Sequence, residues 1–378
     1  MIVTLTALMT PACVIDRAKL RVNAERLKTL CSQRGIQLRP HVKTLKSVQA
    51  AQLYAPPGSA ITVSTLAEAR YFAAAGYRDI LYAVGVTPNK LPAINNLLGA
   101  GVALTVIVDS EAGAEHLIAF AQQFSSPLRV AIEIDVDDHR AGIRAQDPEL
   151  IAVARKIDLQ PGLQFYGVMA HAGASYGCFD ISSRSAMAVQ EARQTAEAAR
   201  LLGEQGIPCE LVSVGSTPTA LVDIERPGIT ELRAGVYATF DCVMAGLGVC
   251  NYNDIAMSVL TSVIGHQVDK GWVLIDAGWM ALSRDQGTGS HALDCGYGLV
   301  CDAKGRLLEG WYVAQTNQEH GIIAHRDGIS PPSELFKYGT TLRILPVHAC
   351  ATGAQFEQYH VTDDNDCVST VWPRVNGW

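Results

Sequence analysis

The segment Ile36-Gln37-Leu38-Arg39-Pro40-His41-Val42-Lys43 decides the fold, because it is the first of eight β-rich runs that alternate with helical stretches. Helical spacing of apolar residues marks Arg17–Gly35, Ala67–Ala75 and Ser182–Leu202. The other seven runs are Ala60–Thr65, Asp79–Gly85, Ala103–Val108, Leu128–Val136, Leu163–His171, Glu210–Ser216 and Ile229–Ala234. Eight strands alternating with helices predict an α/β fold closed into a (β/α)8 barrel, and an open doubly wound sheet is the alternative.

The pattern changes after residue 245, where β-rich runs and Gly-rich or Asp-rich turns follow one another with little helix. The runs are Met257–Val268, Trp272–Ala277, Leu299–Asp302, Trp311–Gln315, Thr341–Val347 and Phe356–Val361. Strands and turns without helices predict a second, all-β domain. We therefore expect the barrel at residues 10–245 and the β domain at 246–378. The N-terminal strand Ile2–Met9 has no place in the barrel and is predicted to pair with the β domain.

Composition excludes several classes of protein. The chain has 378 residues and a net charge of −7 without blocks of like charge, which argues against a nucleic-acid partner. Its ten cysteines are scattered and form no CxxC pair, so we expect no disulfide framework and a reducing cytoplasm. No basic residue precedes Arg17, and the apolar start is shorter than the ~20 residues that span a bilayer, so neither a signal peptide nor a membrane segment is expected.

Polar residues gather where the predicted barrel strands end. Barrel enzymes bind ligands at this end, and buried polar groups are costly unless they are paired, so we predict a polar pocket there. The residues are His41, Lys43, Ser64, Thr65, Asp138, His139, Arg140, His171, Gly173, Ser175, Tyr176, Gly215, Ser216, Thr217, Arg233, Gly235, Val236 and Tyr237.

Two glycine-containing segments follow the last two strands of the predicted barrel. Gly215-Ser216-Thr217 leads into a short helix, whose first N–H groups can bind an anion, and glycine lets the anion approach closely. Gly235-Val236-Tyr237 can donate from the opposite side. A Gly-Ser-Thr sequence alone is more often a turn. The joint position after strands seven and eight favours a phosphate site.

Lys43 ends the first strand on the same face as the phosphate site. Most lysines are solvated, but an amine there suggests a Schiff base with pyridoxal 5'-phosphate (PLP). Such an amine must lose a proton, and burial together with the nearby Arg39 would lower its pKa. Lys46 is the competing candidate. It follows a predicted helix start, where a solvated role is expected.

Three further residues have both an ordinary and a functional interpretation. Arg140 is either a surface charge or a donor to the phenolate oxygen of PLP. His171 is either a core histidine or a stacking partner of the pyridine ring. Arg233 would contact the ring nitrogen or the phosphate. If it contacts the nitrogen, the ring is a weaker electron sink, which leaves room for a second electrophile.

His348-Ala349-Cys350 is the predicted site of that electrophile. In an extended segment alternate side chains point to one side, and imidazole with thiolate suits zinc. Two ligands leave positions for water or substrate, although a cysteine beside a histidine is usually packing. Gln318 and His320 are candidate substrate contacts. His320 could also be merely structural, and Asp276 and the segment Ser283-Arg284-Asp285 are open to the same two interpretations.

The motifs together resemble the fold-type III PLP enzymes, the alanine racemase-like group, and within it the branch of D-serine dehydratases and D-threonine aldolases. The resemblance covers nearly the whole chain. The motifs that carry it are Thr10-Pro11-Ala12, Val14-Ile15-Asp16, Arg39-Pro40-His41-Val42-Lys43-Thr44, Val212-Ser213-Val214-Gly215-Ser216-Thr217-Pro218-Thr219, Glu231-Leu232-Arg233-Ala234-Gly235-Val236-Tyr237, Gln318-Glu319-His320-Gly321 and Leu345-Pro346-Val347-His348-Ala349-Cys350.

The resemblance implies that Lys43 is the PLP lysine and that His348 and Cys350 are metal ligands. It implies a homodimer, with active sites between the barrel of one subunit and the β domain of the other. Aldolases of this branch tend to carry a carboxylate where Cys350 stands, with a manganese-type metal. Cysteine therefore favours a dehydratase and zinc, with manganese, cobalt and magnesium as alternatives.

The expected reaction is β-elimination of water from a D-3-hydroxy amino acid. Lys43 would remove the Cα proton, and the metal would help the β-hydroxyl to leave. 3-Hydroxyaspartate of D-threo configuration is the favoured substrate and D-serine the second. An aldolase that releases glycine is the alternative, whereas a racemase, with Tyr176 or His171 as second base, and a non-catalytic PLP carrier are weaker ones. The candidate cations for a second substrate carboxylate are Arg140, His139, Arg284 and His320.

Overall fold

The computed structural model describes residues 3–363 and 367–378. It divides into two compact units, one of residues 26–235 with 377–378 and the other of residues 1–25 with 236–376. These bounds differ from the expected 10–245 and 246–378, because β2 (Ala12–Asp16) pairs with β11 (Met257–Gln267) and the Asn23 amide donates to the carbonyls of Ala238 and Asp254. Within the described residues, no helix is long and apolar enough to cross a membrane.

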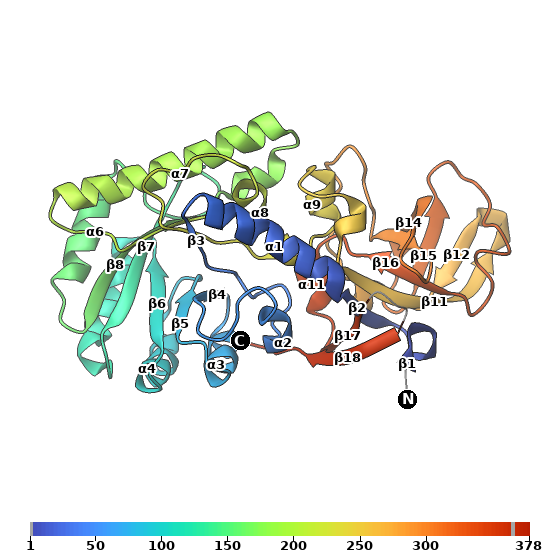
Figure 1. Ribbon diagram of the computed structural model, residues 1–378, viewed down its shortest axis with the longest axis horizontal. Coiled ribbons are helices and arrows are strands. Elements are labelled where there is room, and N and C mark those ends of the chain that lie inside the picture. Colours follow the sequence, from blue (N-terminus) through green and yellow to red (C-terminus); the bar gives the residue numbers. More distant parts are fainter. Residues whose placement is uncertain (1–2, 364–366) are drawn as a thin grey trace. The chain divides into compact units, whose positions relative to one another are not determined.

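The first unit is a barrel of eight parallel strands in the order β3-β10-β9-β8-β7-β6-β5-β4 (Figure 1). A bridge between His41 and Thr62 joins the two ends of this sheet, with Val42 N donating to Thr62 O at 2.9 Å. Every strand lies within its predicted run, so the barrel prediction is confirmed. The strands are β3 Gln37–Leu38, β4 Ile61–Val63, β5 Asp79–Tyr82, β6 Ala103–Val108, β7 Leu128–Ile134, β8 Leu163–Ala170, β9 Leu211–Val214 and β10 Glu231–Leu232.

Helices cover the outside of the strands (Figure 1). Side chains of Thr65, Ser110, Asp147 and Asp180 accept N–H groups of the first turns that follow them, which fixes where four of the helices begin. The helices are α1 Arg17–Gln33, α2 Val48–Ala51, α3 Leu66–Ala74, α4 Leu91–Gly99, α5 Glu111–Phe120, α6 Pro148–Asp158, α7 Ile181–Glu204 and α8 Thr217–Ala220. The longest, α7, is the predicted helix Ser182–Leu202 extended by one residue at its start and two at its end.

A polar network of charged side chains is buried in the barrel unit. The Arg39 guanidinium lies 2.8 Å from the Glu231 carboxylate and 2.8 Å from Asp79, and the Arg39 and Glu231 side chains are only 3% and 2% exposed. Ser213 Oγ donates to Glu231 at 2.7 Å and accepts from Arg233 Nε at 2.8 Å. Because Glu231 pairs with Gln37 on one side and Ser213 on the other, this network connects the first strand to the last two.

The second unit is a ten-stranded sheet in the order β1-β18-β17-β2-β11-β12-β15-β14-β13-β16, with β11 also pairing with β16. Three short helices, α9 Cys242–Gly246, α10 Trp279–Leu282 and α11 Ala349–Gly353, belong to it. Its strands are β1 Val3–Thr4, β2, β11, β12 Trp272–Ile275, β13 Leu299–Cys301, β14 Leu307–Thr316, β15 Gly321–His325, β16 Thr341–Leu345, β17 Gln358–Thr362 and β18 Cys367–Pro373. The expected all-β character is confirmed.

The sequence missed β2, β15 and β18. β2 is a short buried run directly before a helix, β15 starts on glycine, and β18 has mostly exposed or half-exposed side chains, so all three lack the apolar alternation that marks a half-buried strand. Of the predicted N-terminal strand, Val3–Thr4 pairs with β18, while Leu5–Ala7 forms a 3-10 helix and Ile2 lies outside the described residues.

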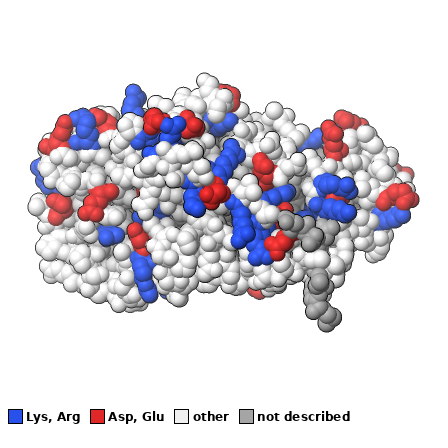
Figure 2. Space-filling model, in the orientation of Figure 1, with Lys and Arg blue, Asp and Glu red and all other residues white. Residues whose placement is uncertain are grey.

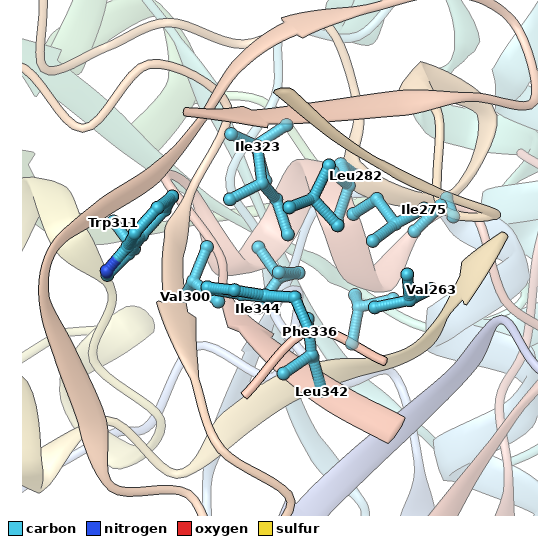
Figure 3. Packing of buried hydrophobic residues seen from close by; sticks show 14 residues of the cluster. Val263, Ile275, Leu282, Val300, Trp311, Ile323, Phe336, Leu342 and Ile344 are labelled. Atoms are coloured by element: carbon cyan, nitrogen blue, oxygen red, sulfur yellow. The ribbon is translucent and has the colours of Figure 1, made fainter. Parts of the chain in front are cut away.

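The core of the β unit is a cluster of apolar side chains from several strands (Figure 3). Trp311, Phe336 and Ile323 pack with Ile344 and Val263 in it, and each is at most 6% exposed. The Trp311 and Phe336 rings lie 4.7 Å apart between centroids. On the face drawn in Figure 2, basic and acidic side chains are interspersed, in keeping with the modest net charge.

We expect Glu231→Gln to lower the free energy of unfolding by about 3–5 kcal/mol, because it leaves the buried Arg39 guanidinium short of one charge partner. The matched control is Glu225→Gln. Glu225 pairs with Arg34, but its side chain is 77% exposed, and such a pair contributes about 0–1 kcal/mol. Urea denaturation followed by circular dichroism measures both. Equal losses for the two variants would mean that the buried pair is no constraint on the barrel.

Candidate active site

Lys43 lies just beyond the bridge that closes the barrel, and its side chain is half-buried. Among the described residues, its Nζ has no hydrogen-bond or ion-pair partner. The side chain runs along the backbone of Gly235, where a Cβ atom would lie 3.5 Å from Lys43 Cε. The lysine amine therefore lies beside Gly235 without a carboxylate partner among the described residues.

Lys46 differs from the solvated role expected for it. Its backbone is left-handed, with φ of 46°, and its Nζ lies 2.8 Å from the carboxylate of Glu68. Glu68 is fully buried and also accepts hydrogen bonds from Ser64 and Thr65. A carboxylate partner stabilises the ammonium form, which is not nucleophilic. Of the two lysines, Lys43 is the one suited to Schiff-base chemistry.

Arg39 also has a different role from the expected one. Its charge is balanced inside the barrel by Glu231 and Asp79, so it is not the cation that acts on the candidate site. Arg233 is instead the arginine whose charge acts on the histidines of the site. Burial, reinforced by the charges of Lys43 and Arg233, holds the pKa of His41 well below its usual value and lowers the pKa of His171 to about 3. Both imidazoles are therefore neutral at physiological pH.

The predicted phosphate segment Gly215-Ser216-Thr217 lies against the loop that follows β8. Gly215 has φ of +134°, and a Cβ there would lie 2.1 Å from the carbonyl oxygen of Arg233, so only glycine fits. His171 Nδ1 is 3.0 Å from Gly215 O, and Ser216 Oγ is 2.7 Å from Ser175 Oγ. The structure thus brings together residues from two strand ends that the sequence places 41 to 44 positions apart.

Arg233 is 4% exposed and held from two sides. Its Nε donates to Ser213, and its Nη2 donates to the carbonyl of Ala170. Its Nη1 has no hydrogen-bond partner among the described residues. A buried guanidinium with a spare donor, the Lys43 amine and two neutral imidazoles form a site with a surplus of positive charge. Such a site fits the phosphate and phenolate charges of PLP.

Arg140 and Tyr176 lie at the outer part of the barrel mouth. Arg140 pairs with Glu133 at 3.3 Å, and its side chain is 62% exposed, so the surface interpretation holds in part. Tyr176, in the 3-10 helix Gly173–Gly177, is 38% exposed. His139 packs on Gly173, where a Cβ would lie 2.2 Å from its ring. The role of His139 in this unit is therefore to join two loops.

The other predicted residues belong to the β unit. Val236 and Tyr237 are buried in the 3-10 helix Val236–Ala238, with which the β unit resumes after Gly235. Gln318 and His320 are exposed in the turn between β14 and β15. The carbonyl groups of Asn317 and Gln318 in this turn accept hydrogen bonds from the first N–H groups of α10. Arg284 stacks on Trp279, with its guanidinium carbon 4.6 Å from the ring centroid.

We expected His348 and Cys350 to share an extended segment, and the structure differs from this expectation. His348 is extended, with φ of −133°, but it caps α11, and Cys350 is inside that helix. His348 Nδ1 lies 2.6 Å from Asp285 Oδ2, an orienting contact to which the sequence assigned no definite role. Asp241 accepts the N–H groups of Met244 and Ala349 and so fixes the start of α11.

The surroundings of His348 favour a positive charge. Burial disfavours the imidazolium, but the hydrogen bonds of Asp285 and Cys350 and the charge of Asp241 outweigh it and raise the pKa of His348 to about 11. Within the described residues, no group of three or more His, Cys, Asp or Glu side chains is placed to hold a metal. His348 interacts with Cys350 as well as with Asp285, which holds the imidazole at Nδ1.

Comparison with known proteins agrees with this fold. The family model described as alanine racemase, N-terminal domain, matches residues 15–242, and that of the putative serine dehydratase domain matches residues 256–362. The chain belongs to the alanine racemase-like family of fold-type III PLP enzymes.

Among its relatives is D-threo-3-hydroxyaspartate dehydratase of Delftia sp. (strain HT23), 48% identical over 99% of both chains. The solved structure of that enzyme superimposes with a TM-score of 0.96, covering 99% of this chain and all of the other. D-Serine dehydratase of Dictyostelium discoideum is 28% identical, covering 97% of each chain, and 3-hydroxy-D-aspartate aldolase of Paracoccus denitrificans is 28% identical, covering 97% and 91%.

We expect His171→Gln to flatten the dependence of stability on pH. The pKa of His171 is lower in the folded than in the unfolded chain, so unfolding takes up a proton below the unfolded value of 6.5. Stability is unaffected above that pH and falls by up to ~1.4 kcal/mol per pH unit below it. A plot of the denaturation midpoint against pH, between roughly pH 6 and 4, should lose this contribution to its slope in the variant. His116→Gln, at an exposed histidine, should keep it; an unchanged slope in His171→Gln would contradict the assignment.

Proposed function

We propose that this protein is a PLP-dependent and metal-dependent dehydratase, a carbon-oxygen lyase that eliminates water from a D-3-hydroxy amino acid. D-threo-3-Hydroxyaspartate, which would yield oxaloacetate and ammonia, is the favoured substrate, and D-serine is the second. The observation that carries the proposal is the Lys43 amine, which has no carboxylate partner among the described residues and whose side chain lies beside Gly235. The 48% identity to a D-threo-3-hydroxyaspartate dehydratase supports the substrate.

The barrel supplies the residues that would hold PLP. Lys43 would bind its aldehyde carbon, Ser216 with the N–H groups around Gly215 and Gly235 its phosphate, and His171 the face of its ring. Arg233 would donate from Nη1 to the pyridine nitrogen or the phosphate, and Arg140 to the phenolate oxygen. Thr217, Tyr176, Val236 and Tyr237 complete the proposed set. When bound, PLP supplies the electron sink for a carbanion at Cα.

Lys43, His171 and Arg233 would have different roles at this site. Lys43 would be the base for the Cα proton, because it is the amine at the closing bridge of the barrel that no described carboxylate binds. His171 is neutral and hydrogen-bonded to Gly215 O, so it contributes a fixed apolar face without adding charge. Arg233 keeps its position through Ser213 and Ala170 while its spare donor faces the site.

His348 and Cys350 are the proposed metal ligands, with zinc favoured because imidazole and thiolate are zinc ligands. A bound divalent metal supplies Lewis acidity to the departing β-hydroxyl. Asp285 holds the imidazole by its Nδ1 and leaves Nε2 for the ion. A metal-free structure of the related dehydratase is that of a cysteine-to-alanine mutant, which supports the role of Cys350. His320 and Gln318 remain proposed substrate contacts.

The assembly and cellular location are proposals of the same kind. Three large apolar side chains of one segment, Tyr176, Phe179 and Ile181, are 38%, 46% and 62% exposed, which supports a surface covered in a homodimer. None of the ten cysteines forms a disulfide, which supports a reducing cytoplasm.

The first test of the function is product analysis with D-threo-3-hydroxyaspartate. We expect oxaloacetate and ammonia without glycine, no activity after the metal is removed with a chelator, and recovery on adding zinc. Manganese, cobalt and magnesium are tested in parallel to identify the metal, and D-serine tests the substrate range. The elimination needs the Lewis acid because hydroxide is a poor leaving group. Glycine with glyoxylate would instead identify an aldolase and contradict the dehydratase.

A matched pair of lysine-to-arginine variants tests the role of Lys43. Lys43→Arg should abolish turnover, because a guanidinium stays protonated and cannot bind the aldehyde covalently. Borohydride reduction followed by peptide mass spectrometry should find the cofactor on Lys43 in the wild type and none on the variant. Lys46→Arg keeps the ion pair with Glu68 and should retain both the label and most of the activity. A label on Lys46 would overturn the assignment.

A further inference from the structure

A carboxylate that the sequence did not single out lies behind the candidate site. Glu191, on α7, is 1% exposed and forms no ion pair with any described lysine or arginine. Its Oε1 accepts the N–H groups of Ala172 and Gly215, each at 3.0 Å, and its Oε2 accepts the Thr219 hydroxyl at 2.7 Å. All the hydrogen bonds of this buried carboxylate go to loops at the barrel mouth.

These contacts join the two loops that form the candidate site. Ala172 directly follows His171 after β8, and Gly215 directly precedes Ser216 after β9. One side chain on an outer helix therefore fixes both the stacking histidine and the phosphate segment relative to each other. The hydrogen bond between His171 Nδ1 and Gly215 O, and that between Ser175 and Ser216, depend on the same spacing of the loops.

Glu191 also sets the direction of a row of hydroxyl groups. Thr219 has one hydroxyl proton, and Glu191 at 2.7 Å is a better acceptor for it than Ser216 O at 3.3 Å. Thr219 Oγ1 is then an acceptor toward Ser216, whose N–H lies 3.2 Å and whose Oγ lies 3.1 Å away. Thr219 therefore fixes both the backbone N–H and the hydroxyl of Ser216, and Glu191 fixes Thr219, so the carboxylate sets the position of Ser216 at the candidate site.

We infer that Glu191 is a positioning residue for the phosphate group of the cofactor: it holds the loops of His171 and Gly215 together and, through Thr219, fixes the position of Ser216. The inference rests on the proposed PLP-dependent function. A carboxylate is suited to this role because it only accepts, whereas an amide must direct one N–H group at Thr219, Ala172 or Gly215.

The test compares the affinities of the full-length apoprotein for PLP and for pyridoxal, which lacks the phosphate. In Glu191→Gln the affinity for PLP should fall about tenfold to a hundredfold, the loss typical of one or two hydrogen bonds to a charged group. The affinity for pyridoxal should fall much less than that for PLP, because Lys43, which would bind the aldehyde, has no hydrogen bond to Glu191 or Thr219. Fluorescence quenching on titration measures both constants.

Two threonine-to-valine variants provide the controls. Thr219→Val removes the hydroxyl between Glu191 and Ser216 and should also weaken PLP selectively. Thr195→Val lies on the same helix, is fully buried, and loses only a hydrogen bond to the backbone carbonyl of Glu191 at 2.7 Å. It should leave the ratio of the two affinities at the wild-type value. This pair decides the question if Glu191→Gln does not fold.

The outcomes separate the inference from the function on which it rests. If the wild type binds PLP no better than pyridoxal, the proposed phosphate site itself is wrong. If the wild type prefers PLP and both Glu191→Gln and Thr219→Val keep that preference, the positioning role is wrong. Equal weakening of both ligands, as a general loss of stability would produce, also overturns it. Selective loss of PLP in Glu191→Gln or Thr219→Val, with none in Thr195→Val, supports it.

Discussion

The buried contact between Arg39 and Glu231 is the constraint on which the barrel unit depends. Two charges with side chains only 3% and 2% exposed are tolerated because Asp79 and Ser213 complete their hydrogen bonds. Arg39 belongs to the segment that continues β3 and Glu231 to β10, so the pair fixes the first strand against the last. Lys43 and Arg233 lie four and two residues beyond these partners, and their positions follow from the same contact.

The charges near the candidate site show which groups are left for chemistry. Arg39, Lys46 and Arg140 each have a carboxylate partner, namely Glu231, Glu68 and Glu133. Among the described residues, Lys43 has none, and Arg233 keeps one terminal nitrogen without a hydrogen bond. The fold thus neutralises the other cations near the site. The two groups that a phosphorylated aldehyde would bind are left without a carboxylate partner in the described part of the chain.

The linear sequence was sufficient for the features that repeat or alternate. All eight barrel strands and six strands of the β unit, β11, β12, β13, β14, β16 and β17, follow from their apolar runs, and the residues at strand ends follow from the parallel order. It could not reveal partners. The pairing of Lys46 with Glu68 spans 22 positions, and the contacts of Glu191 span 19 to 28. The only signal for Glu191 was an acidic residue among the buried alanines and threonine of one helix face, Ala188, Ala192, Thr195 and Ala198.

The local structure around His348 and Cys350 was predicted wrongly, although the two side chains do meet. A spacing of two residues brings side chains together in a strand, and the sequence suggested a strand. In the structure the extended backbone of His348 turns directly into α11, and the side chains of His348 and Cys350 nonetheless interact. What fixes the imidazole is Asp285, 63 positions away. In the metal site that we propose, the remaining nitrogen of His348 and the thiol of Cys350, two side chains that interact with each other in the structure, would be the groups that bind an ion. With two protein ligands, such an ion keeps coordination positions for the hydroxyl group of a substrate.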